Sequence, residues 1–143
     1  MRERYPKLGL ILIGIGPEAE AHLPELGPVQ DHVLLVGALA PDVTLSVMNQ
    51  LSVLLRPTYF DGDSVSVREA VALGIPVVAS DTGYRPDSVT LFKVGDCGDL
   101  CLHLESALQK VTQNVSARRD WHREEGSAPT MLALYRQLQR NTS

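Results

Sequence analysis

The sequence is poor in basic clusters, aromatic residues and cysteines, and the shortages of basic clusters and of cysteines narrow the possible functions. The formal net charge is −4, whereas proteins that bind nucleic acid neutralise its phosphates with clustered lysine and arginine. The main basic cluster, Arg118, Arg119 and Arg123, is offset by Glu124 and Glu125 and is expected to form a solvated helix face. We therefore expect no nucleic acid partner.

Long apolar stretches and metal-binding cysteine patterns are also absent. No stretch approaches the roughly 20 apolar residues that span a bilayer, and residues 8–15 fit a strand rather than a signal peptide. Cys97 and Cys101, four residues apart on a predicted helix, fit neither a zinc motif nor a disulfide framework. We expect two reduced thiols, one capping the helix and one packing, in a cytoplasmic protein without a transmembrane segment or a metal site.

What is present is a series of short apolar runs separated by glycine, proline and polar residues. These runs are continuous rather than alternating, which is typical of strands buried on both faces of a parallel sheet. The five expected strands are residues 9–13, 33–36, 53–56, 76–79 and 89–92.

The segments between the strands have the spacing of helices. Asp96 or Asp99 is well placed to cap a longer helix whose apolar stripe runs from Leu100 to Val111. Shorter helices are expected over residues 18–23, from Pro41 through Leu51, and over 66–73. The alternation predicts an α/β fold, with a parallel sheet covered by helices on both faces. We expect one domain over residues 1–143, in which residues 115–143 form a C-terminal helical extension.

The glycines after the first strand invite comparison with a dinucleotide-binding site. Gly14 and Gly16 match the first two glycines of that fingerprint, and Ala19 stands at the third position. However, Pro17 follows the second glycine, and Gly37 stands where an acidic residue is needed after the next strand. A strand-to-helix turn that needs small residues explains the glycines better. The G-x-S-x-G nucleophile motif and the acidic pattern of receiver domains are absent as well.

The densest group of small polar and acidic residues lies between the third strand and the following helix. It contains Asp61, Asp63, Ser64 and Glu69, at the carboxyl end of a parallel strand, where open α/β sheets hold ligands. If the helix starts near Ser64, its free N–H groups and positive dipole end favour an anionic group such as a diphosphate. Glu69 can then accept hydrogen bonds from two ribose hydroxyls, and Asp61 can accept hydrogen bonds from the hydroxyls of a sugar.

A purely structural explanation of the same residues is equally open at this point. Ser66 and Glu69 have the spacing of a capping box, in which Ser66 is the N-cap and Glu69 reaches back to its N–H group. Asp61 and Asp63 can be turn residues around Gly62. The two interpretations of Glu69 place the start of the helix two residues apart.

The order of these motifs resembles a known enzyme family. The block from Asp61 to Gly83 contains Glu69-Ala-Val-Ala-Leu-Gly-Ile-Pro-Val-Val-Ala-Ser80. It is similar to the pattern E-G-F-G-L-x-x-x-E-A-M-A-x-G-x-P-V-I-A of GT-B-type retaining glycosyltransferases of family four, the glycogen-synthase and mannosyltransferase-like group. Residues 10–18, 33–39 and 91–100 are similar to other motifs of that family, in the same order.

The resemblance implies a fold, an activity and roles for the loop residues. The fold is the Rossmann-like C-terminal half of GT-B, a doubly wound parallel sheet without its first strand and helix. The activity is transfer of a sugar, with retention, from a nucleotide-diphosphate sugar to an unknown acceptor, without a cofactor or a metal. Asp61 would be catalytic and contact the transferred sugar, and Glu69 would bind the ribose. The remaining donor-binding residues would be Ala38 and Leu39 facing the base, and Gly62, Asp63, Ser64 and Val65 against the diphosphate and sugar.

Two departures from the family pattern affect these expectations. Asp61 is one methylene shorter than the usual glutamate, and Asp63-Ser64 replaces Phe-Gly, which adds negative charge beside the diphosphate unless Arg56 or Arg68 balances it. The family's first strand and helix, with an Arg and a Lys, and its N-terminal acceptor domain have no counterpart. We expect a missing acceptor domain or partner chain, two unpaired strand edges and weak or no transfer by the isolated chain. The alternative is a non-catalytic nucleotide-sugar-binding or assembly module, or the remnant of a decayed glycosyltransferase gene.

Overall fold

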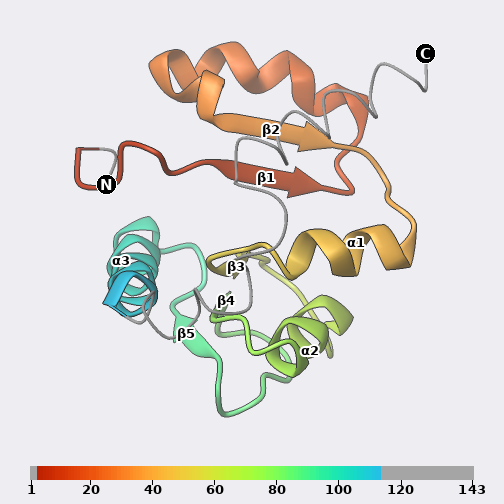
Figure 1. The fold of residues 1–143 in the computed structure, drawn as a ribbon, viewed down its shortest axis with the longest axis vertical. Helices are drawn as coiled ribbons and strands as arrows, with labels where there is room; N and C mark the ends of the chain where they lie inside the picture. The colour runs from red at the N-terminus through yellow and green to blue at the C-terminus, as the bar shows by residue number, and fades with distance from the viewer. Residues whose placement is uncertain (1–2, 114–143) are drawn as a thin grey trace, which may run out of the picture. The chain divides into compact units, whose positions relative to one another are not determined.

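The structure is a computed structural model that describes residues 3–113 (Figure 1). The helical extension expected over residues 115–143 lies outside the described residues. Strands and helices alternate along the described residues except at β4 and β5, which follow each other without a helix between them. The elements are β1 (Leu10–Ile13), η1 (Pro17–His32), β2 (Val33–Val36), α1 (Pro41–Met48), β3 (Leu54–Arg56), α2 (Val65–Ala72), β4 (Val77–Ser80), β5 (Thr90–Phe92) and α3 (Cys97–Gln113).

All strand pairs in the described residues are parallel, as predicted, but they form two sheets rather than one. In the first sheet β1 lies beside β2, from Leu10 opposite Val33 to Ile13 opposite Val36. The second sheet has the order β3-β4-β5. Within residues 3–113, β1 pairs only with β2 and β3 only with β4.

The three-stranded sheet has an apolar core on each face. On one face, Val77 of β4 belongs to a buried cluster with Val67 of α2 and Met48 of α1. On the other face, Val78 clusters with Phe92 and with Ala107 of α3. Because neighbouring residues of a strand point to opposite faces, β4 is buried along its whole length, and Figure 1 shows α2 and α3 on opposite sides of these strands.

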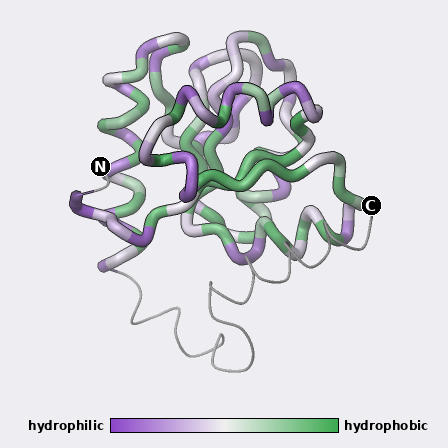
Figure 2. Tube along the Cα trace, turned by 90° about the horizontal axis from the view of Figure 1, so that it is seen from above, coloured by the Kyte–Doolittle hydropathy of each residue, from purple (hydrophilic) through white to green (hydrophobic). Residues whose placement is uncertain are grey.

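The two-stranded sheet and η1 are covered less completely. Instead of a short α-helix over residues 18–23, the structure has a 3-10 helix over Pro17–His32, so that prediction is wrong. Pro24 and Pro28 lack the N–H group that a continuous α-helix needs, and Gly27 has φ +54°, which interrupts the element. No residue of η1 is buried. Figure 2 shows hydrophobic stretches through the middle of the chain trace, with hydrophilic and mixed segments around them.

The helix α3 begins at a polar cap, as predicted. The Asp99 N–H donates to the Asp96 side chain at 3.0 Å, so Asp96 rather than Asp99 is the N-cap. Cys97 and Cys101 are free and exposed, and the expectation that one caps and one packs is wrong. Asp96 already takes the capping position, and both thiols lie on the solvent side of the apolar stripe.

Candidate functional site

Two loops follow the carboxyl ends of β3 and β4, which are adjacent parallel strands. Residues 57–64 lead from β3 into α2, and residues 81–89 lead from β4 to β5. Because parallel neighbours end at the same edge of their sheet, the two loops lie side by side. The sequence-predicted acids are all in or just after the first of these loops.

The two loops are joined by backbone contacts. The Tyr84 N–H donates to the Gly62 carbonyl at 3.0 Å, and Asp63 and Tyr84 form a parallel bridge. Gly83 has φ +62°, and a Cβ there would collide with the carbonyl oxygens of Asp61 and Gly62. Ser80 adds a hydrogen bond from its buried hydroxyl to the Thr58 carbonyl at 2.6 Å. The loops therefore form one unit, which we call the loop joint.

Asp61 lies at the centre of the loop joint, and its side chain is only 12% exposed. One carboxylate oxygen, Oδ2, accepts hydrogen bonds from Arg56 Nε at 3.0 Å, Arg85 Nη2 at 3.0 Å and Thr58 Oγ1 at 3.3 Å. Among the described residues, Oδ1 accepts none. The carboxylate is therefore held through one oxygen, and the other remains available to a ligand.

This environment stabilises the charged form of Asp61. The hydrogen bond from Arg56 holds the pKa of the Asp61 carboxyl below its ordinary value of 3.8, against the opposing effect of burial. The positive charges of Arg56 and Arg85 and the hydrogen bond from Thr58 also lower this pKa. Asp61 is consequently an anion throughout the physiological pH range.

Asp63 has its own cationic partner. Arg68 Nε donates to Asp63 Oδ1 at 2.6 Å, and the carboxylate raises the pKa of the guanidinium. The guanidinium carbon also lies 5.3 Å from the centre of the Tyr84 ring, within range of a cation–π contact. Arg68, one of the two arginines expected to balance the extra charge, thus does so. The side chains of Asp61 and Asp63 both bind arginines rather than the backbone of a turn around Gly62.

The start of α2 tests the capping-box interpretation of Glu69. The N-cap is Ser64 and the first helical residue is Val65, so Ser66 lies inside the helix and the capping-box alternative is wrong. Ser66 instead shares a hydrogen bond with the Ser64 hydroxyl at 3.1 Å. The N-cap makes no side-chain cap hydrogen bond. The N–H groups of the first helical turn therefore keep their donor capacity toward the loop.

Glu69 is half-buried on the second turn of α2. Its carboxylate has no hydrogen bond or ion pair with any residue in the described part of the chain. A half-buried carboxylate without a partner is costly unless water or a ligand binds it. It remains free to bind hydroxyl groups.

The structure collects most, but not all, of the predicted donor-binding residues. Gly62, Asp63, Ser64 and Val65 follow one another into α2, and Ser64 is buried whereas Val65 is exposed. Ala38 and Leu39 lie in the loop between β2 and α1. In residues 3–113 no hydrogen bond connects that loop to the loop joint.

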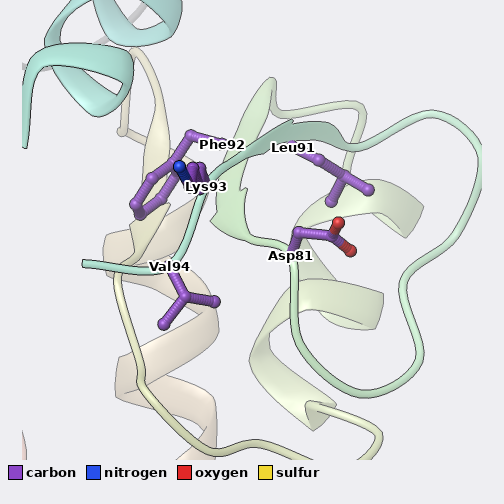
Figure 3. Close-up of a pocket in the computed structure, with 5 residues that line it drawn as sticks. All are labelled: Asp81, Leu91, Phe92, Lys93 and Val94. Carbon is purple, nitrogen blue, oxygen red and sulfur yellow. The ribbon is translucent and has the colours of Figure 1, made fainter. Parts of the chain in front are cut away.

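A hollow of about 410 Å³ lies at the ends of β4 and β5, and Asp81 is the one residue of the loop joint among those that line it (Figure 3). Its lining residues are Asp81, Leu91, Phe92, Lys93 and Val94. None of them is a predicted site residue. The candidate site is therefore defined by the side chains of the loop joint, and the hollow adds space next to it.

Two other types of site are absent from the described residues. No group of three or more histidine, cysteine, aspartate or glutamate side chains there is arranged to hold a metal ion. Within the same residues, no helix has the length and apolarity needed to cross a membrane.

Arg85 is the main site residue that the sequence analysis missed. Its partner Asp61 is 24 residues away, so no local spacing connects them. The available signal was positional, because Arg85 follows Gly83 in the loop after β4, at the same sheet edge as the acidic loop.

Comparison with known proteins identifies the family. Residues 1–113 match the protein family described as glycosyl transferases group 1. The chain belongs to the group 1 glycosyl transferases. No curated protein matches the sequence closely enough to count as a relative.

Two solved structures show how this group 1 chain relates to larger enzymes. A lipopolysaccharide outer core galactosyltransferase, WaaB, in its apo form, superposes with a TM-score of 0.60 and 25% identity over 71% of this chain. A sucrose-phosphate synthase from Thermosynechococcus elongatus superposes with a TM-score of 0.61 and 24% identity over 92% of this chain. The fold is thus the Rossmann-like α/β fold of GT-B glycosyltransferases. The chain spans 32% and 39% of the lengths of these two proteins.

Proposed function

We propose that this chain is the donor-binding part of a retaining glycosyltransferase that transfers a sugar from a nucleotide-diphosphate sugar to an acceptor. The observation that carries the proposal is the start of α2 at Ser64. It places an uncapped helix N-terminus, which favours anions, one turn before the unpartnered carboxylate of Glu69. The solved galactosyltransferase with 25% identity over part of this chain supports a nucleotide sugar as the donor.

The charges around the loop joint are compatible with an anionic donor. The loop joint and the elements beside it contain three carboxylates, Asp61, Asp63 and Glu69, and three guanidinium groups, Arg56, Arg68 and Arg85. Because Asp61 and Asp63 are each paired with arginine, the loop carries no uncompensated negative charge that would repel a diphosphate. The extra acid of this chain therefore does not exclude the proposed donor.

Each residue has a distinct role in the proposed reaction. Glu69 binds the ribose hydroxyls, the turn from Gly62 to Val65 lies along the diphosphate, and Asp61 contacts the transferred sugar. Ala38 and Leu39 face the base. In such a reaction the protein mainly positions the donor and stabilises the departing diphosphate, without a cofactor or a metal. We also propose a cytoplasmic location, which the two free cysteines support.

Transfer requires an acceptor site in addition to the donor site. Since the chain spans about a third of the two solved enzymes, we propose that an acceptor domain or partner chain completes the cleft. The isolated chain should bind donor and show little or no transfer. Robust turnover by these 143 residues alone would contradict this part of the proposal.

Donor binding is tested by titrating the chain with UDP- and GDP-sugars by calorimetry. Glu69→Ala should weaken binding at least about tenfold, because hydrogen bonds to a charged group are lost. Glu20→Ala, in the exposed η1 segment, is the matched control and should bind as tightly as the unmodified chain. Equal binding by Glu69→Ala and the unmodified chain would show that Glu69 has no role in the donor site. Binding without transfer after an acceptor domain is supplied would favour a non-catalytic module.

A further inference from the structure

Arg85 is a buried cation, and only some of its N–H donors have a hydrogen-bond acceptor. Its side chain is 3% exposed, whereas that of Arg56, the other arginine on Asp61, is 40% exposed. Nη2 donates to Asp61 Oδ2 and Nη1 donates to the Tyr84 carbonyl, each at 3.0 Å. Nε is buried without an acceptor in the described residues. Arginine stays charged at any accessible pH, so its burial depends on the Asp61 carboxylate.

The loop joint fixes where this guanidinium can lie. The hydrogen bond from the Tyr84 N–H to Gly62 and the close approach of Gly83 set the distance between the two loops. The second anchor of Arg85, the Tyr84 carbonyl, belongs to the same short segment. The fork of the guanidinium therefore spans from a fixed backbone group to one particular oxygen of Asp61.

All three hydrogen bonds to Asp61 meet at Oδ2, and none reaches Oδ1. A carboxylate with one anchored oxygen cannot rotate freely about its terminal bond. Its second oxygen then points in a defined direction with its acceptor capacity unused. Preorganisation of this kind makes a hydrogen bond to a ligand specific.

We infer that Arg85 is a positioning residue that holds Asp61 through Oδ2, so that Oδ1 can accept a hydrogen bond from a hydroxyl group of the donor sugar. This inference rests on the proposed function, because it requires a sugar nucleotide at the loop joint. It assigns Arg85 no direct contact with the sugar. It also separates the sugar contact at Asp61 from the nucleotide contact at Glu69.

The first test needs no ligand. The side-chain carboxyl resonance of Asp61 is followed by NMR against pH in the unmodified full chain, in Arg85→Gln, in Arg85→Lys and in the control Arg4→Gln. Arg4 contacts Glu105 and not Asp61. Loss of the buried cation should move the Asp61 midpoint upward in Arg85→Gln, and Arg4→Gln should leave it unchanged. An unchanged midpoint in Arg85→Gln overturns the inference.

The second test separates the sugar from the nucleotide. Affinities are measured for UDP against UDP-galactose and for GDP against GDP-mannose. Arg85→Gln should remove most of the affinity that the sugar adds, a loss of about tenfold, and change nucleoside diphosphate affinity less than about twofold. Arg85→Lys keeps a charge without the fork and should restore the midpoint in part but not the sugar affinity. Equal weakening of both ligands by Arg85→Gln, or full recovery in Arg85→Lys, overturns the inference.

Failure of the proposed function looks different. If the unmodified chain binds none of the four ligands, the proposed donor site is wrong, and so is the proposed contact between Asp61 and the sugar. The NMR titration still decides whether Arg85 controls the state of Asp61. A thermal melt of each variant confirms that it is folded before either result is interpreted.

Discussion

The three-stranded sheet and the two-stranded sheet are built from similar apolar runs but are buried very differently. Every residue of β4 is buried, with α1 and α2 packed on one face and α3 on the other. In β1, by contrast, no residue is fully buried, and Leu10 is 41% exposed. The candidate site belongs to the well-packed sheet. Similar apolar composition therefore produces strands in both sheets. How much each strand stabilises the fold depends on whether helices cover one or both faces of its sheet.

The largest expected difference concerns two glycines with positive φ, one beside each sheet. Gly83→Ala should lower the free energy of unfolding by about 3 kcal/mol, because left-handed strain adds to a clash with two backbone carbonyls. Gly14→Ala, at φ +76° with open space around it, should cost only about 1 kcal/mol. Urea unfolding monitored by circular dichroism measures both. Equal losses would mean that the loop joint is not a rigid contact.

Core truncations should show the same contrast. Val78→Ala removes buried methyl groups from a fully buried position and should cost about 2 kcal/mol. Leu10→Ala removes more carbon but from a half-exposed strand, and should cost less than about 1 kcal/mol. Chemical denaturation of the two variants provides the measurement. A larger loss for Leu10→Ala would show that β1 is more completely covered than the structure indicates.

Acid should weaken the sheet that carries the loop joint through Asp61. The pKa of this carboxyl is lowered in the folded chain, so its stabilising contribution is present above its unfolded value and is lost as the pH falls through the folded pKa. Asp61→Asn should therefore flatten the decline in stability below about pH 4. Unfolding free energies measured at a series of acidic pH values test this. An unchanged slope in Asp61→Asn would mean that the two arginines do not stabilise the carboxylate.

The smallest effect is expected for the thiols of α3. Both cysteines are exposed, so Cys97→Ser and Cys101→Ser should each change the free energy of unfolding by less than about 0.5 kcal/mol. Native protein should react with two equivalents of a thiol reagent. Protection of either thiol in the folded chain would restore the packing role that the sequence suggested.

Much of the fold could be predicted because it depends on local pattern. The apolar runs located all five described strands to within about one residue, since each run is short and bounded by a breaker. The N-cap at Asp96 could also be predicted, because the capping contact spans only three residues. Division of the strands into two sheets follows from pairing partners, which no single run specifies.

The site was less accessible from sequence because its contacts are long-range. The capping box at Ser66 failed because the helix starts two residues earlier, at Ser64, directly after Asp63, which pairs with Tyr84 across the loop joint. The η1 segment was misjudged because its prolines allow a tighter helix that has no apolar face. The sequence analysis did not find Arg85 because its contact with Asp61 forms only when two loops that are distant in the sequence come together.

The contact of Gly83 with the carbonyls of Asp61 and Gly62 also bears on protein engineering. The backbone of residues 57–64 leaves no room for a side chain at Gly83, so neither loop can be replaced independently of the other. A graft from a related enzyme that exchanged only residues 57–64 would meet a partner surface shaped for a different backbone. Donor preference in this chain should therefore be transferable only when residues 57–64 and 81–85 are exchanged together.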